Sequence, residues 1–221
     1  MIHVPTAPWA HYIGDATAWS CAVLAGLWVR RTAPALVDRL ARTTEPSYFI
    51  ALGIGGVIGA WLFGSLNLAL SHSIAGALAG GIIGVEVWKW RHGVTVSTGS
   101  AFVLPIAIGI AVGRWGCLFS GLIDGTHGIP TRLPWAVDLG DGIGRHPVEI
   151  YESLAMLAYI AAYARWPAVR GFHVFVIVYA VQRFWWEFLK PYPTLVGPFN
   201  LFHLLMLGLI TYGFIWRRRD R

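Results

Sequence analysis

Four ionisable residues lie within apolar stretches of the sequence, where charge is costly: Glu86, Arg114, Arg183 and Glu187. At membrane depth such a side chain costs about 2.5–3.5 kcal/mol on insertion scales, so it needs a partner inside the protein. Tyr179, Arg183 and Glu187 recur at intervals of four residues and would share one face of a helix. Arg183 and Glu187 can therefore neutralise each other in part. This pair is consistent with a functional site and equally with purely structural packing.

Arg114 lies within the segment Gly113-Arg114-Trp115-Gly116-Cys117, near the end of an apolar run. The flanking glycines let another backbone or a ligand approach the guanidinium closely. A guanidinium presents a planar fork of donors that suits phosphate, and in a membrane protein the phosphate at hand is a lipid head group. The alternative is an arginine that extends to the membrane interface.

A polar segment rich in glycine and proline, 123–147, separates two apolar runs. Loops of this length are usually functional lids or mere connections. The segment carries several residues able to exchange protons or bind cations: Asp124, Asp138, Asp141, His127 and His146.

The residues that follow this segment have simpler interpretations. His146 is either an acid–base group, because imidazole titrates near neutral pH, or a loop cap. Glu149 and Glu152 are interpreted as carboxylates that favour a helix N-terminus. Lys190 resembles an interface anchor, and Glu86 is expected to pair with the neighbouring Lys89.

The sequence lacks the common catalytic signatures. It contains no Ser-His-Asp order, HExxH, P-loop or dinucleotide-binding fingerprint. Its two cysteines, Cys21 and Cys117, have no CxxC partner, so we expect no metal site, cofactor or disulfide.

The elements that position these residues are expected to be membrane helices. Hydrophobic residues make up 56% of the 221 positions and charged residues only 13%, against about 25% charged residues in soluble domains. A helix needs about 20 mostly apolar residues to cross the hydrocarbon. The candidate spans are Ala16–Val29, Tyr48–Leu70, Ser73–Trp88, Ala101–Leu122, Glu149–Ala164, Phe172–Leu189 and Phe199–Trp216.

Basic residues orient these spans, because cytoplasmic loops are enriched in lysine and arginine. With the N-terminus outside, three basic residues fall outside and twelve inside. Those outside are Arg132, Arg145 and Lys190, and those inside are Arg30, Arg31, Arg39, Arg42, Lys89, Arg91, Arg165, Arg170, Arg217, Arg218, Arg219 and Arg221. The formal net charge of +6 thus indicates membrane orientation rather than nucleic-acid binding.

The predicted fold is all-α: a polytopic membrane helical bundle of seven spans, with the N-terminus outside and the C-terminus in the cytoplasm. Residues 1–221 form one transmembrane bundle, and 123–147 is an outer-side loop over the site. Ser73–Trp88 is rich in glycine and alanine, so we expect it in the bundle interior with neighbouring backbones packed closely.

An ordered set of short motifs resembles the prolipoprotein diacylglyceryl transferase family, over roughly Ser71 to the C-terminus. The motifs are Gly113–Leu118, Gly121, Asp124–Gly128, Pro130–Trp135, Arg145–Pro147, Tyr151-Glu152, Arg183 with Glu187-Phe188, and the stretch Ala75–Gly84.

The resemblance implies a bacterial enzyme of the cytoplasmic membrane. Such an enzyme moves the diacylglyceryl group of phosphatidylglycerol to the lipobox cysteine of a prelipoprotein and releases glycerol phosphate. Its partners would be that lipid, the prelipoprotein signal peptide and membrane lipids. The expected catalytic residues are Arg114, Arg183, Glu187, Asp124, His146 and His72, and the expected substrate-binding residues are Tyr179, Gly113, Gly116, Cys117, Gly121, Gly128 and Tyr151.

The sequence also departs from the family pattern. Ala75 occupies the position where the family usually has a histidine, with His72 about one turn earlier. Cys117 replaces an asparagine, and Leu122 stands where an acidic residue is usual, with Asp124 nearby. Two alternatives therefore stay open: a transferase that uses the same lipid with another acceptor, and a non-catalytic lipid-binding or transport protein on the same scaffold.

Overall fold

The computed structural model describes residues 1–65 and 72–220, which are mostly helical. In these residues eight α-helices accompany a small three-stranded sheet. The helices are α1 (Ala10–Thr32), α2 (Pro34–Thr43), α3 (Pro46–Gly64), α4 (Ile74–His92), α5 (Val103–Ser120), α6 (Val148–Arg165), α7 (Phe172–Glu187) and α8 (Leu201–Trp216).

Each of the seven predicted spans coincides with a long helix, so their helical character is confirmed. The end of the predicted span Tyr48–Leu70 lies outside the described residues. Within the part of the chain that the structure describes, two segments are long and apolar enough to cross a membrane by length and composition alone, Pro46–Gly64 and Ser100–Asp124. The number of crossings and the orientation of the termini stay predictions.

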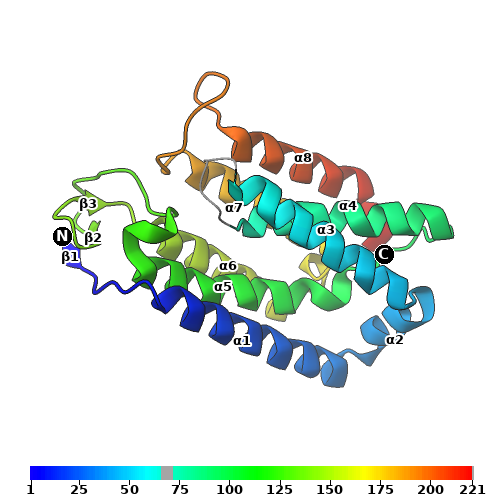
Figure 1. The fold of residues 1–221 in the computed structure, drawn as a ribbon. Coiled ribbons are helices and arrows are strands. Elements are labelled where there is room, and N and C mark those ends of the chain that lie inside the picture. The colour runs from blue at the N-terminus through cyan, green and yellow to red at the C-terminus, as the bar shows by residue number, and fades with distance from the viewer. Residues whose placement is uncertain (66–71, 221) are drawn as a thin grey trace.

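The short helix α2 was not expected from the sequence. It begins with Pro34 in its first turn, where the missing N–H of proline costs no hydrogen bond. Leu40 is buried in this helix, Leu36 and Val37 are partly buried, and the charged residues Asp38, Arg39 and Arg42 are exposed. It lies at the end of the bundle that also holds the C-terminus (Figure 1).

The long helices run back and forth along one direction (Figure 1). The N-terminus, the sheet and the connection between α7 and α8 lie at one end of the bundle. The C-terminus, α2 and the end of α4 lie at the other. The arrangement places the polar segment 123–147 and the N-terminal residues at the same end.

Glycines bring two pairs of helices into close contact. A Cβ atom added to Gly80 of α4 would lie 2.8 Å from the Cα of Gly59 in α3, and one added to Gly116 of α5 would lie 2.7 Å from the Cα of Gly14 in α1. Larger residues would force each pair apart. The predicted close approach of backbones at Ser73–Trp88 is confirmed, and one face of α4 contributes Ala79 to the main core.

The sheet joins the N-terminus to the segment 123–147. Strand β1 (Ile2–His3) pairs in parallel with β2 (Val137–Asp138), which pairs antiparallel with β3 (Gly144–Arg145). Asp138 accepts backbone hydrogen bonds from Gly140 and Gly142, both at 2.9 Å. The bond from Gly140, followed by that from Gly142, holds the pKa of the Asp138 carboxyl below its usual range. The segment is thus an ordered structure against the bundle end.

Candidate active site

Glu152 is the centre of a buried group of charges contributed by three helices and the residues after α7. Its Oε2 pairs with Nε of Arg114 on α5, and its Oε1 with a terminal nitrogen of Arg183 on α7. Lys190 Nζ lies 3.0 Å from the same Oε1. All four side chains are at most 5% exposed, so water screens these interactions little.

Glu187 completes the group from the C-terminal end of α7. Its Oε1 lies 2.6 Å from Arg183 Nε, and its Oε2 accepts a hydrogen bond from Asn200 Nδ2 at 3.3 Å. Asn200 in turn caps the N-terminus of α8 through its Oδ1 and the backbone N–H of His203. The predicted pairing of Arg183 with Glu187 is confirmed. The residue that caps α8, Asn200, thus also holds the second carboxylate oxygen of Glu187.

These five residues, Arg114, Glu152, Arg183, Glu187 and Lys190, are called the arginine cluster below. Three cations and two carboxylates leave it with one formal positive charge. Tyr179, one turn before Arg183, is fully buried, and its hydroxyl has no hydrogen-bond partner in the described part of the chain. Leaving a buried hydroxyl unpaired costs about 1–3 kcal/mol. A bound anion would neutralise the positive charge of the cluster and could accept a hydrogen bond from the Tyr179 hydroxyl.

Two of the sequence interpretations are wrong at this point. Glu152 does not serve the N-terminus of α6, because it faces Arg114 and Arg183 instead. Lys190 is not an exposed anchor, since its side chain is buried against the same carboxylate. The prediction for Glu86 is confirmed, because Lys89 Nζ lies 2.9 Å from its Oε1.

A second polar group lies where α1 begins and α5 ends. The Nδ1 atom of His11 lies 2.7 Å from Asp124 Oδ1, and Thr126 donates a 2.8 Å hydrogen bond to the other oxygen of Asp124. The ligand atoms of His11, Cys117 and Asp124 lie within 4.8 Å of one another. Cys117 Sγ is 4.0 Å from a terminal nitrogen of Arg114. This group therefore borders the arginine cluster.

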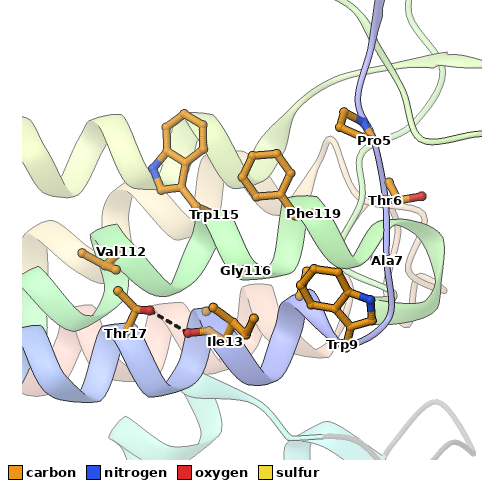
Figure 2. Close-up of a pocket in the computed structure, with 12 residues that line it drawn as sticks. Pro5, Thr6, Ala7, Trp9, Ile13, Thr17, Val112, Trp115, Gly116 and Phe119 are labelled. Carbon is orange, nitrogen blue, oxygen red and sulfur yellow. Dashed lines mark hydrogen bonds between the residues drawn. The ribbon is translucent and has the colours of Figure 1, made fainter.

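An apolar groove with a volume of about 450 Å³ runs between α1, α5 and the N-terminal segment. Its lining includes Trp9 and Ile13 from the beginning of α1 and Trp115 and Phe119 from α5 (Figure 2). Ala10, Gly14 and Gly116 also line it. The groove thus lies along the same two helices that carry His11 and Cys117, although neither residue lines it.

A comparison with known protein families identifies the family of this chain. The sequence model of the prolipoprotein diacylglyceryl transferases matches residues 16–217. The chain belongs to that family.

Relatives within the family give consistent matches. A phosphatidylglycerol-prolipoprotein diacylglyceryl transferase of Finegoldia magna is 30% identical over 72% of this chain and 68% of its own length. That of Cupriavidus pinatubonensis is 30% identical over 79% and 74%, and that of Streptomyces griseus 34% identical over 53% and 39%. The chain thus spans from 39% to 74% of the lengths of these three relatives. No solved structure matches it.

The departures from the family pattern have clear positions in the fold. Ala75 is buried in the main core and offers no group that could exchange a proton. His72 is exposed and lies edge-on to Trp61, with ring centres 4.8 Å apart. His146 Nδ1 is 3.4 Å from the hydroxyl of Tyr151. Among the described hydrogen bonds and ion pairs, none joins either histidine to the arginine cluster.

The glycines of the family motifs shape the backbone around the site. Gly113 and Gly116 face α1, where an added Cβ at Gly113 would lie 3.4 Å from the Cβ of Ala18. Gly121 has a φ of +72°, a conformation that favours glycine, and ends α5. A Cβ on Gly128 would lie 2.8 Å from the Cβ of His146. These glycines bring protein segments together, and their predicted contact with a substrate stays a prediction.

Sequence reasoning missed His11, Thr126 and Asn200. His11 and Asp15 are four residues apart at the start of the first apolar run, a spacing that places them on one helix face. That spacing gave a weak signal. The contact of His11 with Asp124, 113 positions away in the chain, had no signal in the sequence.

Proposed function

We propose that the protein is a membrane transferase that moves the diacylglyceryl group of phosphatidylglycerol to the thiol of a lipobox cysteine. One observation carries the proposal: Arg114 of α5 and Arg183 of α7 converge on the two oxygens of a single buried carboxylate. A phosphodiester offers the same pair of negatively charged oxygens, and guanidinium groups bind such pairs well.

In the proposed complex the lipid phosphate displaces the Glu152 carboxylate from the two guanidinium groups. Lys190 and Glu187 remain to hold Glu152 and Arg183 in place. The excess positive charge of the arginine cluster favours an anionic lipid over a zwitterionic one. Tyr179 is expected to donate its unpaired hydroxyl to the head group.

The transfer forms one bond and breaks one. The acceptor sulfur attacks the glyceryl carbon that bears the phosphate, and the carbon–oxygen bond breaks. The electron pair leaves with the phosphate oxygen, so the phosphodiester with one negative charge becomes a monoester with up to two. Arg114 and Arg183 therefore interact more strongly with the transition state than with the bound lipid, which is the condition for catalysis.

We also propose that the bundle crosses the bacterial cytoplasmic membrane seven times with the N-terminus outside. Two features support this topology. The long helices alternate in direction, and the N- and C-termini lie at opposite ends of the bundle (Figure 1). Basic residues also lie at the proposed cytoplasmic ends of three helices, as the positive-inside rule requires. Arg30 is in the last turn of α1, Lys89 is in the last turn of α4, and Arg217 directly follows α8. The arginine cluster then lies near the outer end of the bundle, where a prelipoprotein signal peptide would arrive.

A second candidate is a transferase that uses the same lipid with another acceptor. Ala75 favours it, because the position that usually carries a histidine in the family has no acid–base group here. Ala75 bears only on the identity of the acceptor, because the proposed lipid binding depends on Arg114 and Arg183.

The test is a turnover assay on purified protein in nanodiscs that contain labelled phosphatidylglycerol. With a lipobox peptide added, we expect release of glycerol phosphate and a peptide mass increased by the diacylglyceryl group. Release without peptide labelling would indicate the second candidate. No release with or without peptide would contradict a transferase and leave lipid binding or transport.

A further inference from the structure

We propose that His11 is the proton acceptor for the incoming thiol and that Asp124 positions its imidazole ring. The inference deepens the proposed transferase function and rests on it. A thiol attacks as the thiolate, so the reaction needs a group that takes the proton. Ala75 cannot supply that group, and His11 provides the imidazole from a different helix.

The contacts of His11 resemble those of a held catalytic histidine. The Asp124 carboxylate is 9% exposed and pairs with Nδ1 at 2.7 Å. A carboxylate this close to one ring nitrogen favours the proton on that nitrogen, which leaves the other nitrogen as the acceptor. Asp15 Oδ2 lies 3.2 Å from that other nitrogen, Nε2, but is 55% exposed. Asp15 can thus turn away when a substrate approaches.

The groups that face His11 come from three elements. Asp15 and Tyr12 lie on its own helix α1, Cys117 on α5 and Asp124 in the short helix that follows α5. Apart from the imidazole and the two carboxylates, the titratable groups are thus a thiol and a phenol. No cation faces the ring among the described contacts.

Two contacts join this histidine to the proposed phosphate site. Cys117 Sγ lies within 4.8 Å of the His11 and Asp124 ligand atoms and 4.0 Å from Arg114. Thr126 bonds to Asp124 and, at 3.0 Å, to Glu149 on α6, one turn before Glu152. The proton acceptor and the arginines that hold the leaving group therefore border the same small region.

The two helices that carry His11 and Cys117 also border the apolar groove. Ala10 and Gly14 of α1 line the groove together with Gly116 of α5. Figure 2 shows the groove bordered by Trp9, Trp115 and Phe119. Acyl chains or the apolar part of a signal peptide would fit such a lining.

The proton balance of the step is complete. The S–H proton moves to His11 Nε2 as the sulfur forms its bond to the glyceryl carbon. The carbon–oxygen electron pair leaves on the phosphate. The imidazolium then releases its proton to water or to the departing glycerol phosphate, which restores the starting state.

The test compares His11→Gln and Asp124→Asn with a matched control, His92→Gln. His92 is also a partly exposed histidine, at 40% against 39% for His11, and it too lies near a carboxylate, Glu45. It is the last residue of α4, which ends at the opposite end of the bundle (Figure 1). Each variant is assayed in the turnover assay for glycerol phosphate release across pH 5–9, and separately for phosphatidylglycerol binding and thermal unfolding.

We expect His11→Gln to lower kcat about 100-fold or more, to bind the lipid as the wild type does, and to lose the fall in rate toward acid pH. Asp124→Asn should lower kcat less, and Asp124→Glu should restore part of it. His92→Gln should match the wild type. A wild-type rate in His11→Gln would overturn the inference while leaving the transferase function intact. Wild-type turnover abolished by EDTA and restored by Zn²⁺ would also overturn it, because His11 would then be a metal ligand. A wild-type protein without turnover would contradict both proposals.

Discussion

Replacing Glu152 with glutamine removes the charge that holds the arginine cluster together. The formal charge of the cluster then rises from +1 to +2, and Arg114, Arg183 and Lys190 lose their shared carboxylate. Removing one partner of a buried ion pair costs about 3–5 kcal/mol. For a protein of this size, such a loss lowers the unfolding midpoint on the order of 10 °C.

The lipid should reverse part of this loss. If the phosphate binds where the Glu152 carboxylate lies, it replaces the missing charge, and the Glu152→Gln variant no longer has a carboxylate to displace. Phosphatidylglycerol should therefore bind the variant more tightly, and every tenfold gain in affinity adds about 1.4 kcal/mol. The lipid should raise the unfolding midpoint more in the variant than in the wild type.

The assay is thermal unfolding in detergent with added phosphatidylglycerol or, as a zwitterionic control, phosphatidylcholine. The matched variant is Glu149→Gln, which neutralises another buried carboxylate on the same helix. An amide oxygen at this position can still accept the hydrogen bond from Thr126, so the variant should unfold near the wild-type midpoint. A wild-type midpoint for Glu152→Gln, or an equal effect of both lipids on it, would refute the reasoning.

Three further predictions concern other parts of the structure. Gly116→Leu should destabilise the protein by at least about 1–3 kcal/mol, because a Cβ there already meets the Cα of Gly14 at 2.7 Å; an unchanged unfolding midpoint would contradict the helix contact. Lys190→Gln should reduce the rate of glycerol phosphate release at least about tenfold, since the loss of a 3.0 Å ion pair costs about 1.5–3 kcal/mol; an unchanged rate would exclude a role at the site. Asp138→Asn should lower the unfolding midpoint at pH 7. Because the native pKa of Asp138 is depressed, the stabilisation by its carboxylate is fully present above the unfolded pKa of about 3.9. This stabilisation disappears as pH falls through the native pKa, so the unfolding midpoints of the wild type and the variant should converge there. A difference in midpoint that does not depend on pH would contradict this.

Local features of the fold could be predicted from the sequence. The long apolar runs indicated the helices, and the spacing of four residues indicated the pairing of Arg183 with Glu187. The glycines of Ser73–Trp88 indicated close packing, which occurs against α3. Each of these signals is contained in one segment of the chain. The short helix α2 was missed because Asp38, Arg39 and Arg42 interrupt its apolar residues, so it contains no long apolar run.

The centre of the site could not be predicted in the same way. Glu152 meets Arg183 across 31 positions in the chain, and a glutamate in the first turns of a helix has a simpler local explanation. Lys190 follows an apolar run, and this pattern is the same for a lysine at the membrane interface and for a lysine buried in the protein. His11 depends on the sheet and the α1–α5 contact, which bring the N-terminus beside Asp124. These contacts exist only after the helices pack.

The most direct test of the central claim measures phosphatidylglycerol binding to Arg114→Gln and Arg183→Gln in nanodiscs or by native mass spectrometry. Arg170→Gln is the control, because Arg170 bonds only to backbone oxygens and to the Tyr163 ring among the described contacts. If the two arginines hold the lipid phosphate, both variants should bind phosphatidylglycerol at least about tenfold more weakly, as loss of a charged hydrogen bond implies, while the control binds as the wild type does. Wild-type binding in both Arg114→Gln and Arg183→Gln would contradict the account.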